Sequence, residues 1–144
     1  MVSLLDVNVL LALAWPTHIH HRPARSWFEA TNPHGWATVS FTEVAFVRLS
    51  SNPAFSPSAP PVAEAIGLLS ALRSLPRHRF LEDPLSITNN PFRNLLVGHQ
   101  QVTDSHLLAL AHHHGVRLVT FDRALSRVIP AGLDESQLLE VLTG

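Results

Sequence analysis

Short apolar runs alternate with helical patterns along this chain, and that alternation limits which folds are open to it. Val2–Leu5, Trp36–Val39 and Val116–Phe121 each have the length and composition of a buried strand. The clearest helical pattern, Thr103–His114, ends at Gly115, a typical left-handed stop. Apolar strands separated by helices are typical of a parallel sheet covered on both faces. We therefore expect an α/β fold with a central, mainly parallel sheet.

Other segments fill in this pattern. Pro16 ends a helix over Val7–Trp15, and the proline-rich stretch Asn52–Pro61 predicts a surface loop. The remaining expected elements are helices over 19–31 and 40–51, a helix with Val62, Ala65, Ile66, Leu69 and Leu72 as its apolar face, a strand at 79–81, a short helix at 123–128 and a short element of either type at 137–142.

Length and composition indicate one globular domain spanning residues 1–144. Hydrophobic residues make up 46% of the chain and charged residues 15%, but no apolar run is long enough to span a bilayer. The absence of cysteine excludes disulfides and thiolate metal sites. With no export signal at the N-terminus, we expect a cytoplasmic protein that does not enter a membrane.

The basic residues are unusual, because all ten are arginine and none is lysine. A P-loop NTPase is excluded, since its phosphate-binding motif requires a lysine. The net charge of −1 gives no general argument for nucleic-acid binding. A nucleic-acid function must therefore be argued from a specific site.

Four acidic residues lie where apolar runs end or helices begin. Asp6 and Asp122 follow the first and last clear strands, Glu43 follows Trp36–Val39 by four residues, and Asp104 opens the helix that starts at Thr103. The carboxyl ends of parallel strands meet at one edge of a sheet, where open α/β sheets bind ligands. We expect these four side chains to gather at that edge.

Each acid also has a purely structural explanation. Ser40-Phe-Thr-Glu43 fits a capping box in which Glu43 returns to the backbone N–H of Ser40, and the three aspartates can each serve a helix N-terminus. Four carboxylates at one edge, however, repel one another unless a cation is present. Hard oxygen ligands without cysteine or paired histidine indicate Mg²⁺ or Mn²⁺, which points to metal-assisted phosphodiester hydrolysis.

Four segments, in order, resemble the PIN-domain ribonuclease family, and within it the VapC-type toxins of bacterial toxin–antitoxin pairs. They are LLDVNVLLAL (4–13), SFTEV (40–44), VTDSHLLALA (102–111) and LVTFDR (118–123). The resemblance implies that Asp6, Glu43, Asp104 and Asp122 are the catalytic, metal-binding acids, with Asn8 and Thr120 as supporting polar residues. Val7 departs from the family, which usually has a hydroxyl residue there.

The same resemblance implies a three-layer α/β/α PIN-like fold and a homodimer. It implies a Mg²⁺- or Mn²⁺-dependent endoribonuclease that cleaves RNA, inhibits translation and is itself inhibited by a small VapB-like antitoxin. Arg93 and Arg123 are candidates for contacts with RNA or antitoxin, because they are close in sequence to Asp104 and Asp122. Ordinary solvated arginines are the alternative explanation for both.

Two other functions remain open from the sequence. A receiver-like phosphoacceptor domain also carries acids around Mg²⁺ at the carboxyl edge of a parallel sheet, although such domains use a lysine that this chain lacks. A catalytically inactive PIN-like binding module is the second. The histidine clusters at 18–21 and 112–114 do not predict a zinc site, since adjacent residues of a helix point in different directions.

Overall fold

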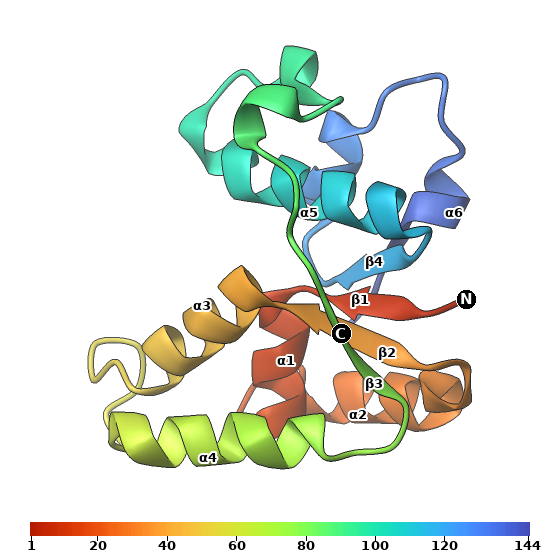
Figure 1. Cartoon of the computed structure of the whole chain (residues 1–144). Coiled ribbons are helices and arrows are strands. Elements are labelled where there is room, and N and C mark those ends of the chain that lie inside the picture. The colour runs from red at the N-terminus through yellow and green to blue at the C-terminus, as the bar shows by residue number, and fades with distance from the viewer.

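The computed structural model describes all residues from Met1 to Gly144 (Figure 1). Its strands and helices are, in order, β1 (Ser3–Leu5), α1 (Val7–Ala14), α2 (His21–Thr31), η1 (Asn32–His34), β2 (Trp36–Val39), α3 (Ser40–Ser50), α4 (Val62–Arg73), β3 (His78–Leu81), η2 (Ile87–Asn89), η3 (Arg93–Leu95), η4 (His99–Gln101), α5 (Val102–His114), β4 (Arg117–Thr120), η5 (Arg123–Val128), α6 (Glu135–Leu138) and β5 (Leu139–Val141), where η marks a 3₁₀ helix.

All five strands form one parallel sheet in the order β3-β2-β1-β4-β5. β1 lies at the centre, where Leu4 pairs with Ala37 of β2 on one side and Leu118 of β4 on the other. The expected parallel sheet is confirmed. The chain leaves β1 toward β2 and later returns to its other side with β4, so the carboxyl ends of both central strands face a topological switch point.

Helices cover both faces of this sheet, which confirms the three-layer α/β/α arrangement (Figure 1). Leu4 and Leu118 point into the core beneath α5, whereas Leu5, Trp36 and Val119 point into the core beneath α1 to α4. Because neighbouring residues of a strand face opposite sides, β1 buries both of its faces. This explains why Ser3–Leu5 is a continuous buried run.

The local signals for helix ends act as expected. Asp6 is the N-cap of α1 and accepts a hydrogen bond from the backbone N–H of Val7, while Pro16 follows the end of that helix. Gly115 ends α5 in the left-handed conformation, with φ of 66°. The chain therefore turns directly from α5 into β4, and the N-terminus of α5 lies toward the carboxyl edge of the sheet.

The expected apolar face of α4 is wrong in part. Ala65 and Leu69 are buried, but Val62 and Ile66 are 55% and 52% exposed. α4 is an outer helix that contacts mainly α3, so one narrow stripe is enough to hold it (Figure 1). None of the helices combines the length and the apolar character that crossing a lipid bilayer requires.

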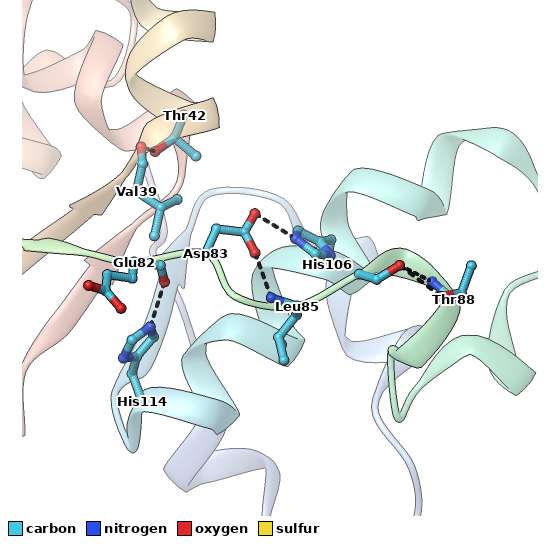
Figure 2. Close-up of polar contacts among 9 residues, drawn as sticks. Val39, Thr42, Glu82, Asp83, Leu85, Thr88, His106 and His114 are labelled. Atoms are coloured by element: carbon cyan, nitrogen blue, oxygen red, sulfur yellow. Dashed lines mark hydrogen bonds and ion pairs between the residues drawn. The ribbon is translucent and has the colours of Figure 1, made fainter.

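The segment after β3 passes from the sheet to the α5 layer, as Figure 2 shows. Nε2 of His114 lies 2.7 Å from the carbonyl oxygen of Glu82, and Nε2 of His106 lies 2.9 Å from Oδ2 of Asp83. Both histidines come from α5, so this helix is tied to the end of β3 at two places. These contacts help to fix the helix that carries Asp104.

Candidate metal centre

Asp6 is the most buried of the four acids, with 6% of its surface exposed. Its Oδ1 accepts the Val7 backbone N–H at 2.7 Å, and its Oδ2 accepts the Thr120 hydroxyl at 2.8 Å. Burial raises the pKa of the Asp6 carboxyl, the two hydrogen bonds lower it, and the charge of Asp122 raises it further. Asp6 is thus an oriented carboxylate in surroundings that disfavour its charge.

Thr120 organises the polar residues around Asp6. Its Oγ1 donates to Asp6 and accepts from the Asp122 backbone N–H at 3.0 Å and from Nδ2 of Asn8 at 3.1 Å. Oδ1 of Asn8 in turn accepts the backbone N–H of Phe121 at 3.2 Å. Asn8 and Thr120 therefore join the start of α1 to the end of β4, as supporting residues would. Their functional role stays a prediction.

Asp104 and Asp122 complete a cluster of three aspartates. Asp104 lies in the first turn of α5, and Asp122 caps η5, accepting the Ala124 backbone N–H at 2.9 Å. Burial, followed by the charges of Asp6 and Asp122, raises the pKa of Asp104 to about 6. Asp6 follows β1, Asp122 follows β4 and Asp104 opens α5, so residues far apart in sequence carry their carboxylates to the carboxyl edge of the sheet.

Glu43 is held away from this cluster. Its Oε2 accepts the Thr38 hydroxyl at 2.6 Å and lies 3.5 Å from Nε of Arg73, and its side chain is only 12% exposed. It is not among the charges that raise the pKa of Asp104. The capping-box prediction is wrong, because Val39 is the N-cap of α3 and no side chain caps that helix. The Glu43 side chain instead contacts Thr38 and Arg73.

The donor chemistry suits a hard divalent cation. The charge of Asp122 raises the pKa of both Asp6 and Asp104, the charge of Asp6 also raises that of Asp104, and no arginine pairs with any of the three, so a cation would relieve this repulsion. In this conformation no three metal-binding side chains are already arranged around one point. Asp6, Asp104 and Asp122 are therefore the candidate ligands, and Glu43 would have to leave Arg73 to join them.

Comparison with known proteins identifies the family of the chain. Residues 3–129 match the PIN domain family. Ribonuclease VapC38 of Mycobacterium tuberculosis is 54% identical to the chain over 121 residues, which cover 84% of this chain and 85% of the relative. The chain belongs to the PIN-domain family, within its VapC group. Both the length of the match and its level of identity support that assignment.

Solved structures show the same fold at low identity. The crystal structure of VapC20 from Mycobacterium tuberculosis, described as a sarcin-ricin loop cleaving toxin, has a TM-score of 0.66 at 17% identity, over 92% of this chain and 97% of that one. VapBC2 from Rickettsia felis, bound to a DNA fragment from its promoter, has a TM-score of 0.64 at 15% identity, over 99% and 100%. The PIN fold is thus present along essentially the whole chain.

The other sequence-derived candidates of this PIN domain lie outside the cluster. Arg93 is exposed and donates from Nη1 to the carbonyl oxygen of Asn90 at 3.0 Å, while Arg123 is exposed in η5. Asn90 is fully buried, and its side chain donates a hydrogen bond to Ser105, the residue that follows Asp104. Arg93 is therefore linked through Asn90 to the start of α5. Whether these arginines contact RNA or antitoxin stays a prediction.

Sequence reasoning missed two residues near the PIN-domain centre. Asp83 follows β3 at the same carboxyl edge and faces His106 of α5 (Figure 2). The pattern that identified Asp6 and Asp122, an acid after a strand, would also have found Asp83. Arg73 pairs with Glu43 from α4, and nothing in the sequence relates those two positions.

Proposed function

We propose that this protein is a Mg²⁺- or Mn²⁺-dependent endoribonuclease that acts as the toxin of a toxin–antitoxin pair. Asp6, Asp104 and Asp122 are the proposed metal-binding residues, with Glu43 as a fourth ligand. Asn8 and Thr120 would orient Asp6 and the end of β4. Cleavage of an RNA needed for protein synthesis would inhibit translation.

The observation that carries this proposal is the convergence of three aspartates from separate parts of the chain. Burial and the charges of Asp6 and Asp122 raise the pKa of Asp104 to about 6, so this arrangement of acids disfavours the charged form of Asp104 in the absence of a cation. Its repulsion is explained if the site evolved to hold a cation. The names of two relatives, a ribonuclease and an RNA-cleaving toxin, support RNA as the substrate.

The chain's own residues prepare the centre for hydrolysis. A divalent cation, when bound, supplies charge neutralisation and a water of lowered pKa for attack on phosphorus. The Thr120 hydroxyl and the Val7 N–H fix both oxygens of Asp6, so this ligand is oriented before substrate binds. Asp104 is partly protonated near pH 6 in the free protein and would release that proton as metal binds.

Partners are proposed on the same basis. The Rickettsia felis structure is a VapBC2 complex, which supports a VapB-like antitoxin as the inhibitor of this chain. Arg93 and Arg123 are proposed as contacts for RNA or antitoxin. We also propose a homodimer as the active form, a cytoplasmic location and no membrane association.

Loss of single aspartates tests the catalytic proposal. Asp6→Asn and Asp104→Asn should each reduce RNA cleavage at least about a hundredfold, because each removes charge that the metal needs. Cleavage of a labelled RNA by purified protein is measured with Mg²⁺, with Mn²⁺ and with EDTA, alongside growth on induction.

The control is Asp134→Asn, which changes an exposed helix cap outside the centre. Full cleavage by Asp6→Asn or Asp104→Asn, or cleavage that persists in EDTA, contradicts the proposal. Metal binding without cleavage of any RNA would instead support an inactive binding module. A stable acyl phosphate formed with a small phosphodonor would support the receiver-like alternative.

A further inference from the structure

The cavity between α4 and β3 lies directly beside Glu43. It has a volume of about 610 Å³, and its polar lining includes Glu43, Ser70, Arg73, Ser74 and His78. α4 and β3 belong to the half of the sheet that ends in β3, the edge strand. The cavity therefore lies on the edge-strand side of the sheet, next to Glu43, the candidate fourth metal ligand.

This part of the chain is distinctly basic. Arg73, Arg77 and Arg79 are three of the ten arginines, and no acidic residue occurs between Glu64 and Glu82. Of the three, only Arg73 lines the cavity, where its Nε lies 3.5 Å from Oε2 of Glu43, and Arg79 points to the opposite face of β3 from Phe80. Positive charge beside a centre that cleaves phosphodiesters suits the backbone of a nucleic acid.

An exposed aromatic ring accompanies that charge. Phe80 of β3 is 49% exposed, and the guanidinium carbon of Arg73 lies 4.9 Å from the centroid of its ring. Phe80 pairs with Thr38 of β2, the residue whose hydroxyl holds Glu43. An exposed ring with an arginine beside it can stack an unpaired base.

Arg73 has donors to spare for a ligand. Its single ion pair with Glu43 spans 3.5 Å, its side chain is 42% exposed, and its guanidinium donates no hydrogen bond within the chain. A guanidinium presents up to five donors and suits the two oxygens of a phosphate. If Glu43 moves to a metal, Arg73 loses its partner and is available to an anion.

We propose that the cavity between α4 and β3, together with the exposed Phe80 ring beside Arg73 at its border, is a subsite for one nucleotide of a single-stranded RNA, in which Arg73 binds a backbone phosphate and Phe80 stacks on a base. The subsite rests on the proposed nuclease function and deepens it, since it gives the strand a direction of approach along β3. Single-stranded RNA is favoured over duplex because the base must be unstacked to reach Phe80.

Binding of a short fluorescein-labelled single-stranded RNA tests this subsite. Anisotropy is measured in EDTA, so that the RNA stays intact, over a series of salt concentrations. Phe80→Leu should weaken binding about tenfold through lost stacking. Arg73→Met should weaken binding and lower the slope of log K against log salt by about 0.7, the value for one phosphate contact on a single strand.

Arg25→Met is the matched control, because Arg25 is an exposed arginine that pairs with Glu29 and does not line the cavity. It should change neither the affinity nor the salt slope as much as Arg73→Met does. In Mg²⁺, Phe80→Leu should raise KM for RNA cleavage with little change in kcat. The two positions are exposed, and thermal melts check that both variants fold.

Wild-type affinity in Phe80→Leu and Arg73→Met overturns the subsite, as does an equal loss in Arg25→Met. If these variants lose only antitoxin binding or self-association while RNA binding is unchanged, the surface serves a protein and the proposal is wrong. If the wild-type protein cleaves RNA and both variants bind RNA normally, the subsite is wrong but the proposed nuclease function stands. Wild-type protein that neither binds nor cleaves RNA refutes the proposed function as well.

Discussion

The hydroxyl of Thr120 uses its full hydrogen-bonding capacity, with one donor and two acceptor positions occupied. Thr120→Val should destabilise the protein by about 2 kcal/mol, because the buried carboxylate of Asp6, the partly buried amide of Asn8 and the backbone N–H of Asp122 lose a partner at once. Urea denaturation at pH 7 in EDTA measures this loss.

Thr120→Ser is the informative comparison, since it keeps the hydroxyl and removes only a methyl group. It should retain most of the stability and most of the nuclease activity. If Thr120→Ser and Thr120→Val lose the same free energy of unfolding, packing rather than hydrogen bonding accounts for the effect.

The raised pKa of Asp104 has a consequence for stability. A carboxyl whose pKa rises from 3.8 to about 6 on folding stabilises the fold below pH 3.8, and that contribution is lost as the pH rises through 6. Asp104→Asn removes this disfavoured charge and should therefore make the metal-free protein more stable at pH 7.5. The gain should be only about 1 kcal/mol, because Asp104 is partly exposed and solvent screens its charge.

The measurement is thermal unfolding in EDTA at pH 7.5 and pH 4, with Asp134→Asn as a control at an exposed cap. The advantage of Asp104→Asn should disappear at the lower pH, where wild-type Asp104 is protonated. Adding Mg²⁺ should raise the Tm of the wild type more than that of the variant. A variant less stable than the wild type at pH 7.5 would contradict the like-charge cluster.

The positions of Asp6, Asp104 and Asp122 in the fold could be predicted from the sequence because they follow local rules. Asp6 and Asp122 cap short helices directly after strands, so their place at the sheet edge follows from the chain itself. The capping contact expected for Glu43 is absent because its partners are Thr38 in β2 and Arg73 in α4. A contact between α3 and α4 depends on how the outer helices pack, which a single sequence does not reveal.

Two glycines in helical segments should respond oppositely to the same substitution. Gly67 lies inside α4 and Gly115 ends α5 with φ of 66°, and an added Cβ would meet no atom within 4 Å at either position. Gly67→Ala should stabilise the protein by about 0.5 to 1 kcal/mol through helix propensity. Gly115→Ala should destabilise it by about 1 kcal/mol, because the left-handed conformation disfavours a side chain.

Chemical denaturation of both variants measures these shifts, and Gly132→Ala is a control in a turn without positive φ, also with open space around it. A loss of stability in Gly67→Ala would mean that α4 is covered by another surface at that point. A neutral Gly115→Ala would mean that α5 ends differently in solution.

The elements that were foreseen are those with strong internal periodicity or clear terminal signals. α1, α3, α5, β1, β2 and β4 agree with expectation to within a residue or two. Elements that were not clearly predicted depend on contacts with other parts of the fold. The segment 137–142 divides into the end of α6 and β5, and β5 forms by pairing with β4. The exposed side of α4 was likewise set by its neighbours rather than by its own pattern.

Beyond the region matched to the PIN domain, the chain still contributes to the core. The family match ends at residue 129, but Leu138 and Leu139 are 4% and 6% exposed, and Nε1 of Trp27 donates to Glu140 at 3.0 Å. Removing residues 138–144 should cost about 5 kcal/mol or more, since two buried leucines and an entire strand pairing are lost. That approaches the total stability of a small domain.

Circular dichroism and gel filtration of the truncated protein test this expectation. A chain shortened by only Thr143 and Gly144, both exposed, is the control and should fold normally. If the chain that ends at residue 137 unfolds at the wild-type temperature, β5 does not contribute to the stability of the fold.

The hydrogen bond between Asp6 and Thr120 joins residues 114 positions apart, and Asp104 and Asp122 also come from the last third of the chain. During synthesis, Asp6 leaves the ribosome before Asp104, Thr120 and Asp122 have been translated. Pairing across such a sequence separation is a late step in folding. A nascent chain therefore cannot assemble the candidate centre, and the ribosome that makes it is not exposed to the proposed activity, until residue 122 has been translated.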